Sequence, residues 1–379
     1  MRIVLAFVLA GLCACTTFAQ QPEGGRVRIR DLGIQPGVMR PGPLNAITDV
    51  AGVRVGHQTI VRGANVRTGV TAILPHPGDV FLEKSRAAVF TGNGYGKAAG
   101  FEQVRELGEI ESPIVLTNTL NVGTAVAAVQ RWTLDQPGHE QVRSVNAVVG
   151  ETNDGFLNDI RGQHVTAEHV FAALAAAKAG PVFEGNVGAG TGTATLGFKG
   201  GIGTASRVLT KEQGGWTVGV LVQTNFGGTL LIDGMRAGEK LGVVDPKDYR
   251  GDDQAVNGGS VMVVIATDAP VDARNLERMA ARAPLGLARV GSWMGNGSGD
   301  FMIAFSTANR IDTRVAARTD SAEFLRNDAT GGLFLAVVES VEEAVLNAMA
   351  AAGDMTGRDG NTLKRLPLDQ VRAMAAARK

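Results

Sequence analysis

The chain of 379 residues has only two cysteines, Cys13 and Cys15, and both lie near its beginning. Residues 3–14 form a short apolar run, and small residues before Gln20 fit a cleavage site, so we expect residues 1–19 to be a signal peptide. The alternative is a lipoprotein box in which Cys15 carries a lipid anchor. Both readings predict a secreted or periplasmic protein whose mature chain has no disulfide, cysteine nucleophile or thiolate metal site.

The sequence also lacks an excess of charge, because 37 Lys and Arg residues balance 37 Asp and Glu residues. Nucleic acids and anionic membranes require a basic surface, so we expect neither as a partner, apart from the lipid anchor. Among the five histidines only His164 and His169 are closely spaced, and they flank the expected start of a helix. We therefore expect no metal site. Residues 185–206 are dense in glycine but lack the Walker and dinucleotide-binding spacings, so we expect backbone turns and no cofactor there.

Apolar residues make up 44% of the chain, and 51 glycines are spread among the apolar runs. The length and composition fit two domains or one large α/β domain with a sizeable core. Strands often follow strands, which argues against simple βαβ winding and favours two helix layers around sheets. We expect strands within residues 47–57, 68–74, 87–96, 114–120, 144–149, 216–224, 260–267, 301–306 and 332–338, and helices within 123–131, 166–177, 272–290, 339–352 and 369–378.

One stretch combines a reactive side chain with a flexible backbone. Gly258 and Gly259 precede Ser260, which opens an apolar, β-branched run with the length of a buried strand. The simplest interpretation is a tight turn that leads into a core strand. The alternative is that Ser260 is a nucleophile, or even the first residue of a new polypeptide.

A serine hydroxyl needs a base before it can attack a carbonyl group. If the bond between Gly259 and Ser260 is cleaved, the new α-amine titrates near pH 8 and can accept the hydroxyl proton. Glycine before the scissile bond also tolerates the strained backbone that an N-to-O acyl shift requires. A Ser-His-Asp triad at Ser298 is the competing arrangement, but the nucleophile-elbow spacing is absent and a strand is expected after Ser298.

Six motifs in the same order resemble the family of L-aminopeptidase/D-amino-acid esterase-amidases and β-peptidyl aminopeptidases, self-processing relatives of ornithine acetyltransferase. The resemblance extends over about residues 32–366. The motifs are TDVAGVRVGH at 48–57, ETNDG at 151–155, GGIGTASR at 200–207, NGGS at 257–260, NGSGD at 296–300 and TGRDGNT at 356–362.

The resemblance implies a proenzyme that is cleaved between Gly259 and Ser260 into an α chain, residues 20–259, and a β chain, residues 260–379. It implies an α/β fold, an αββα four-layer sandwich that resembles the N-terminal nucleophile hydrolases with different connectivity. A homotetramer of αβ units follows from the same resemblance. The expected substrates are short peptides, amides or esters with a free amino terminus.

The resemblance also assigns roles to individual residues. Asn225 would be the oxyanion-hole amide, while Ser298 and Asp300 would orient and polarise the nucleophile. Glu151 is the candidate that pairs with the substrate ammonium, although a structural role in its loop is equally open. Phe156 occupies a position that is often tyrosine in the family, so one hydroxyl contact with the substrate or intermediate is missing. The alternative is that Phe156 anchors its loop in the core.

Two other functions remain open at this point. One is acyl transfer as in ornithine acetyltransferase, whose processed nucleophile is threonine whereas this chain has Ser260. The other is an unprocessed periplasmic binding protein with the same fold, and the lack of a hydroxyl group at Phe156 favours this function.

Overall fold

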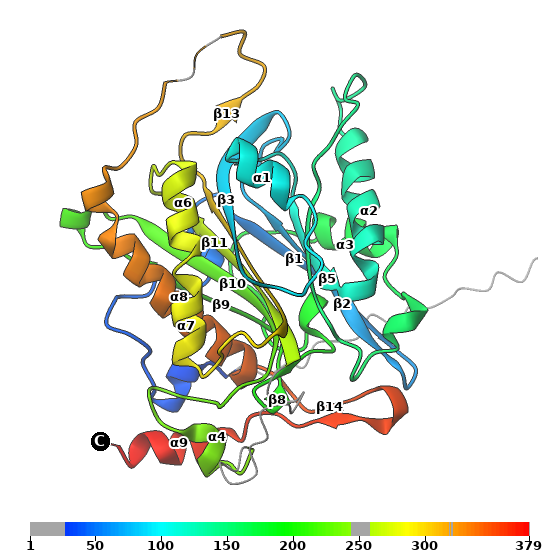
Figure 1. Cartoon of the computed structure of the whole chain (residues 1–379), viewed down its shortest axis with the longest axis vertical. Coiled ribbons are helices and arrows are strands. Elements are labelled where there is room, and N and C mark those ends of the chain that lie inside the picture. Colours follow the sequence, from blue (N-terminus) through cyan, green and yellow to red (C-terminus); the bar gives the residue numbers. More distant parts are fainter. Residues whose placement is uncertain (1–26, 244–257, 318, 320, 379) are drawn as a thin grey trace, which may run out of the picture.

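Two stacked β-sheets form the centre of the protein in the computed structural model, which describes residues 27–243, 258–317, 319 and 321–378 (Figure 1). The first sheet has the order β1-β2-β5-β6 and the second has the order β13-β3-β12-β11-β10-β9, with β4 paired to β3. The strands of the first sheet are β1 Arg54–Arg62, β2 Val66–Leu74, β5 Ile114–Asn118 and β6 Val148–Thr152. Those of the second are β3 Glu83–Gly94, β4 Glu109–Ile110, β9 Ile202–Val208, β10 Thr217–Phe226, β11 Gly258–Thr267, β12 Gly297–Ser306 and β13 Ile311–Asp312.

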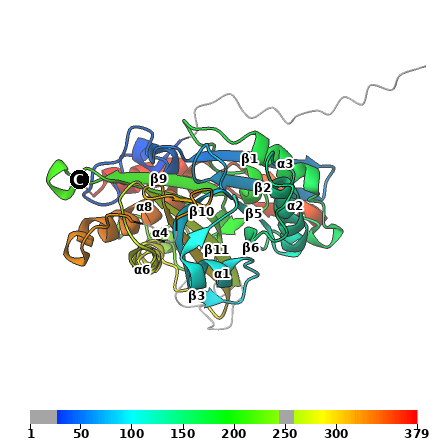
Figure 2. The same ribbon diagram turned by 90° about the horizontal axis from the view of Figure 1, so that it is seen from above.

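Helices cover the outer face of each sheet, and Figure 2 shows the two helix groups on opposite sides of the stacked sheets. Helices α2 Val122–Leu134 and α3 Ala167–Ala175 pack on the first sheet. Helices α6 Ala273–Ala280, α7 Ala283–Arg289 and α8 Gly331–Ala350 lie on the second. The predicted αββα sandwich is therefore confirmed. No helix in the described ranges has both the length and the apolar character needed to cross a membrane.

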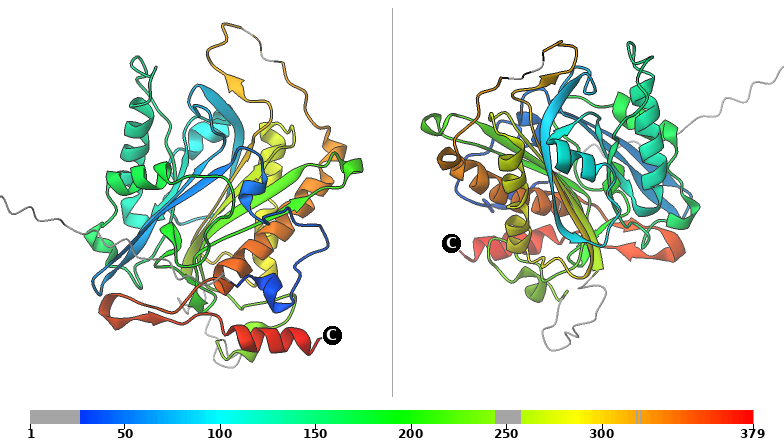
Figure 3. Two further views of the ribbon diagram at one scale, coloured as in Figure 1. Left: turned by 180° about the vertical axis from the view of Figure 1, so that it is seen from behind. Right: turned by 45° about the horizontal axis from the view of Figure 1, so that its top comes forward.

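The smaller elements lie at the edges of the sandwich. Helices α4 Ala237–Lys240 and α9 Leu368–Ala376, labelled in Figure 1, lie side by side beyond one end of the second sheet (Figure 3). The remaining helix and hairpin strands are α1 Phe101–Leu107, β7 Ala194–Thr195, β8 Phe198–Lys199, β14 Met355–Thr356 and β15 Thr362–Leu363. Short 3₁₀ helices span Ile29–Leu32, Ile47–Asp49, Thr119–Asn121, Ile160–Gly162, Gly188–Gly190, Lys211–Gln213, Asn327–Ala329 and Arg358–Gly360.

Three apolar layers hold the four structural layers together. One lies between the first sheet and α2 and α3, one between the two sheets, and one between the second sheet and α6, α7 and α8. The second sheet is consequently buried on both faces. This explains why residues 261–266 of β11 form an unbroken apolar run, since each of them is fully buried.

Helix α8 corrects one sequence prediction. A strand was expected at residues 332–338 and a separate amphipathic helix after it, but one helix begins at Gly331 and continues to Ala350. Helix α8 packs so closely on β9 that a Cβ atom at Gly203 would overlap the carbonyl oxygen of Ala344. The sequence predicts a strand here because the segment is a short apolar run, and α8 shows little helical periodicity since every residue from Ala336 to Ala350 is buried.

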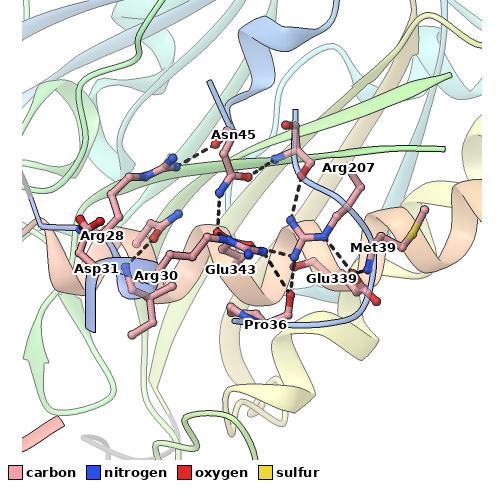
Figure 4. Close-up of polar contacts among 12 residues, drawn as sticks. Arg28, Arg30, Asp31, Pro36, Met39, Asn45, Arg207, Glu339 and Glu343 are labelled. Atoms are coloured by element: carbon pink, nitrogen blue, oxygen red, sulfur yellow. Dashed lines mark hydrogen bonds and ion pairs between the residues drawn. The ribbon is translucent and has the colours of Figure 1, made fainter. Parts of the chain in front are cut away.

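The charged residues of α8 are buried in ion pairs and do not face solvent. Arg207 of β9 is fully buried and binds both Glu339, at 2.9 Å, and Glu343, at 2.8 Å (Figure 4). Arg30 from the N-terminal segment binds Glu343 at 2.6 Å. These bonds join the N-terminal segment, the second sheet and α8 in one cluster.

Strand β11 lies at the middle of the second sheet and sets the register of the residues of interest. It pairs antiparallel with β10, which places Ser260 opposite Asn225. It pairs parallel with β12, which places Ser260 opposite Gly299, between Ser298 and Asp300. Three segments that are distant in the sequence therefore meet at the start of β11.

Candidate active site

The bond between Gly259 and Ser260 lies at the beginning of β11 in a conformation that glycine alone adopts readily. Gly259 has a φ angle of +140°, and a Cβ atom there would overlap Cα of Phe226 and lie 2.5 Å from the carbonyl oxygen of Asn225. The hydroxyl of Ser260 donates a hydrogen bond to the Gly259 carbonyl oxygen at 2.5 Å. The backbone N–H of Gly299 donates to Ser260 Oγ at 3.2 Å. The nucleophile candidate is thus held against the carbonyl group that precedes it.

Asn225 lies beside Ser260 on the neighbouring strand β10. Its Oδ1 accepts a hydrogen bond at 3.0 Å from the backbone N–H of Ala194 in β7. Because the oxygen is occupied in this way, the Nδ2 group is the part of the amide that remains to donate elsewhere. This orientation suits a donor that stabilises a developing oxyanion.

Ser298 and Asp300 flank the nucleophile from the other neighbour, β12. Ser298 Oγ donates to Asp300 Oδ1 at 2.7 Å, and both side chains are buried. Burial raises the pKa of Asp300 to about 6, although the hydrogen bond from Ser298 acts in the opposite direction. Within the described part of the chain, Asp300 Oδ2 is buried without a hydrogen-bond partner. A β-bulge between Asp300 and Phe301 shifts the register with β3 at this point.

Glu151 lies on β6, in the sheet stacked over this site, and is connected to it through a tightly packed loop. A Cβ atom at Gly96 would lie 3.0 Å from Glu151 Oε1, and one at Gly299 would lie 2.5 Å from Gly96 Cα. The side chain of Glu151 accepts hydrogen bonds from the N–H of Lys97, at 2.9 Å, and from the hydroxyl of Thr119. Burial raises the pKa of Glu151, while both hydrogen bonds lower it.

Phe156 does not anchor its loop in the core, since half of its surface is exposed. The loop is held by other contacts: Asn361 donates to the Phe156 carbonyl oxygen at 2.9 Å, and Asn158 donates to Asp154 at 2.9 Å. The structure thus brings Ser260, Asn225, Ser298 and Asp300 together on three adjacent strands (β10, β11 and β12). Sequence reasoning missed the donors to these side chains, because backbone and hydroxyl donors leave no pattern in the sequence. The backbone N–H groups of Ala194 and Gly299 donate to Asn225 and Ser260, and Lys97 and Thr119 donate to Glu151.

The two closely spaced histidines have hydrogen-bond partners of their own. His164 Nε2 lies 2.9 Å from Asp159 Oδ2, and His169 Nδ1 accepts from the N–H of Thr166 at 3.0 Å, as part of the cap of α3. Across the described ranges no group of three or more His, Cys, Asp or Glu side chains could hold a metal ion. The chemistry available at the start of β11 is that of a hydroxyl nucleophile with amide and carboxyl partners.

Comparison with known proteins gives concordant results over almost the whole chain. Residues 45–363 match the model of peptidase family S58. The chain is 42% identical to the β-peptidyl aminopeptidase BapA of Sphingosinicella microcystinivorans, over 98% of this chain and 95% of that protein.

Solved structures agree with this assignment. The β-aminopeptidase of a Burkholderia species is 43% identical with a TM-score of 0.85, over 93% of this chain and 99% of that one. The L-aminopeptidase D-Ala-esterase/amidase of Ochrobactrum anthropi, described as a prototype of the serine aminopeptidases and a variant of the Ntn hydrolase fold, is 40% identical with a TM-score of 0.84. That match covers 93% of this chain and 98% of that one. The chain therefore belongs to peptidase family S58 and is an enzyme of the serine aminopeptidase and amidase class with the N-terminal-nucleophile hydrolase fold.

Proposed function

We propose that the enzyme activates itself by cleaving the peptide bond between Gly259 and Ser260. Ser260 Oγ attacks the Gly259 carbonyl carbon, the C–N bond breaks, and an ester joins the two residues while the amine is released. Water then hydrolyses the ester, which leaves a carboxylate on Gly259 and a free α-amine on Ser260. The observation that carries this proposal is the 2.5 Å distance from Ser260 Oγ to the Gly259 carbonyl oxygen, at a glycine with a φ angle of +140°.

After cleavage, Ser260 supplies both the nucleophile and the base for the aminopeptidase reaction. The neutral α-amine accepts the hydroxyl proton as Oγ attacks the substrate carbonyl, and it returns a proton to the leaving amine. Asn225 Nδ2 donates to the oxyanion, and the pair Ser298 and Asp300 orients the new amino terminus. Water then hydrolyses the acyl-enzyme and releases the amino-terminal residue of the substrate.

The substrates that we propose are short peptides, amides and esters with a free amino terminus. Glu151 is the group proposed to pair with the substrate ammonium, because it is buried, acidic and close to the loop that packs on Gly299. The names of the Sphingosinicella and Burkholderia relatives extend the proposal to β-amino acid residues at the amino terminus. Phe156 is proposed to contact the substrate with its exposed ring, without the hydrogen bond that tyrosine would make.

Intact-mass measurement and N-terminal sequencing of the purified enzyme test the mechanism. We expect two chains, one of which begins at Ser260, and hydrolysis of an aminoacyl p-nitroanilide. Ser260→Ala is expected to remain one chain without activity. Gly123→Ala is a suitable control because a Cβ atom at Gly123 meets open space in α2. A single uncleaved chain that hydrolyses the substrate would contradict the mechanism.

We also propose that the enzyme is exported and works as a homotetramer of αβ units. The export signal, together with Cys13 and Cys15, lies outside the described residues, so the support for export is the sequence pattern alone. Mass spectrometry of the mature amino terminus separates cleavage before Gln20 from lipidation at Cys15. Light scattering of the purified enzyme measures the number of αβ units.

A further inference from the structure

A buried lysine lies beside the proposed site and takes no part in the chemistry described above. Lys199, the last residue of β8, is fully buried, which is unusual for a lysine. Its Nζ donates to the carbonyl oxygens of Gly190, at 3.0 Å, and Gly200, at 2.8 Å. These two bonds close the segment 190–200 on itself, so that its two ends are held by one side chain.

The segment 190–200 is the part of the chain that orients Asn225. Within it, the N–H of Ala194 donates to Asn225 Oδ1 at 3.0 Å, which fixes which way the amide faces. The hydroxyl of Thr195 donates to Thr224, the residue before Asn225, at 2.7 Å. Figure 1 shows β8 beside the end of β10, where Asn225 lies. A displacement of this segment would therefore turn the Asn225 amide directly.

We propose that Lys199 is a positioning residue for the oxyanion hole: its side chain closes the segment 190–200 and thereby keeps the Asn225 amide aimed at the substrate carbonyl. This inference rests on the proposed role of Asn225. Lys199 contacts neither the nucleophile nor the substrate, and it acts through Ala194 and Asn225.

Asp154 is the acidic side chain that acts on Lys199 in the core. Burial lowers the pKa of Lys199 to about 7, and the opposite charge of Asp154 raises it. Burial raises the pKa of Asp154 to about 7, and Glu151 adds to that increase. A Cβ atom at Gly192 would lie 2.9 Å from Asp154 Cβ, so the segment that Lys199 closes packs directly against Asp154.

The test is a double-mutant cycle on the processed enzyme, measured with an aminoacyl p-nitroanilide. Asn225→Ala alone is expected to lower kcat by about 10²–10³. Lys199→Met alone should lower kcat by roughly 10- to 100-fold with little change in KM, because only the transition state carries the oxyanion. Adding Lys199→Met to Asn225→Ala should lower kcat by less than about threefold, since the amide that it positions is already gone.

Lys84→Met is the matched control, because Lys84 of β3 is a partly buried lysine in ion pairs with Glu109 of β4 and with Glu111, which follows β4. The fold-change in kcat caused by Lys84→Met should be the same with and without Asn225→Ala. If the fold-loss of kcat from Lys199→Met is the same with and without Asn225→Ala, or if Lys199→Met leaves kcat unchanged, the positioning role is wrong. If Asn225→Ala alone keeps the wild-type kcat, the proposed oxyanion role of Asn225 fails first.

Hydrogen exchange gives a second readout that does not depend on processing. In the uncleaved Ser260→Ala background, Lys199→Met should speed exchange of the Ala194 amide by about tenfold or more, whereas Lys84→Met should not. Lys199→Gln, which keeps N–H donors, should restore part of the protection. Unchanged exchange at Ala194 in a folded Lys199→Met protein would overturn the inference.

Discussion

Asp300→Asn is expected to raise the free energy of unfolding at neutral pH and to lower kcat/KM. Asp300 is buried, holds one hydrogen bond from Ser298, and has a pKa raised by burial from 3.8 to about 6. In the unfolded chain this carboxyl group ionises near pH 3.8, whereas in the folded chain it stays protonated up to about pH 6. Ionisation between these pH values therefore stabilises the unfolded state relative to the folded state. The ionised carboxylate therefore lowers the free energy of unfolding, and asparagine removes this penalty.

The size of the effect follows from the shift in pKa. A rise of roughly two pKa units corresponds to about 3 kcal/mol. This stabilising contribution of the protonated form is fully present below pH 3.8, is lost as the pH rises through about 6, and is absent above it. About half of the loss, roughly 1.5 kcal/mol, falls between pH 5 and pH 8.

Urea unfolding at pH 5 and pH 8 measures this difference. Both proteins should carry Ser260→Ala, so that each is a single chain. We expect the stability of Asp300→Asn relative to its parent to increase by about 1.5 kcal/mol between pH 5 and pH 8, because the pH dependence of all other groups cancels. If the difference in stability between the two proteins does not change with pH, the pKa of Asp300 is not raised in the folded state.

The same substitution in the cleavable protein tests the function of Asp300. In the proposed mechanism the neutral α-amine of Ser260 should give log(kcat/KM) a slope of about one below pH 8, and protonation of Asp300 should add a second unit of slope below about pH 6. Asp300→Asn should lower kcat/KM by roughly 10- to 100-fold and keep the single slope throughout. A second unit of slope that persists in Asp300→Asn would show that another group causes it.

Three further substitutions test other parts of the structure. Gly259→Ala should slow self-cleavage by at least about tenfold, because the φ angle of +140° costs roughly 1–3 kcal/mol for alanine and the added Cβ atom overlaps Phe226. A time course on denaturing gels measures the rate, and cleavage at the wild-type rate would contradict this expectation. Glu151→Gln should raise KM for aminoacyl p-nitroanilides by about 10- to 100-fold with little change in kcat, whereas Glu102→Gln, at an exposed side chain of α1, should leave KM unchanged. An unaltered KM in Glu151→Gln would show that Glu151 does not bind the substrate ammonium. Arg207→Met should lower the free energy of unfolding by about 3–5 kcal/mol, because it removes the cation that pairs with buried Glu339 and leaves Arg30 as the cation that pairs with buried Glu343. Arg105→Met in a surface pair should change the free energy of unfolding by less than about 1 kcal/mol, and equal effects would show that the buried cluster adds no stability.

Strand β11 was predictable from the sequence because an apolar run after two glycines has one simple structural solution. The central position of β11 in the sheet explains its composition, since both faces are covered. Its neighbours were not predictable from local patterns. Asn225 and Ser298 come from strands 35 and 38 residues away in the sequence, and only the family resemblance connected them with Ser260.

Helix α8 shows where local reasoning fails. Its glutamates have the spacing of a solvent-exposed face, yet Glu339 and Glu343 are buried against Arg207, more than 130 residues earlier in the chain. No local pattern reveals such a partner. Lys199 is a similar case, because its glycine-rich surroundings predict turns but not that a lysine side chain bridges them.

The position of β11 and β12 between β10 and β3 has a consequence for the enzyme after the proposed cleavage. A cut before Ser260 creates two polypeptides whose strands still alternate within one sheet: β9 and β10 come from the first, β11 and β12 from the second, and β3 from the first again. Neither piece retains the complete second sheet. Folding before the cut is a first-order event, whereas recovery after it requires two molecules to meet. We therefore expect the cleaved enzyme to refold poorly. Once denatured, it should regain activity slowly and with second-order dependence on protein concentration. The uncleaved Ser260→Ala chain should refold at a rate that does not depend on protein concentration.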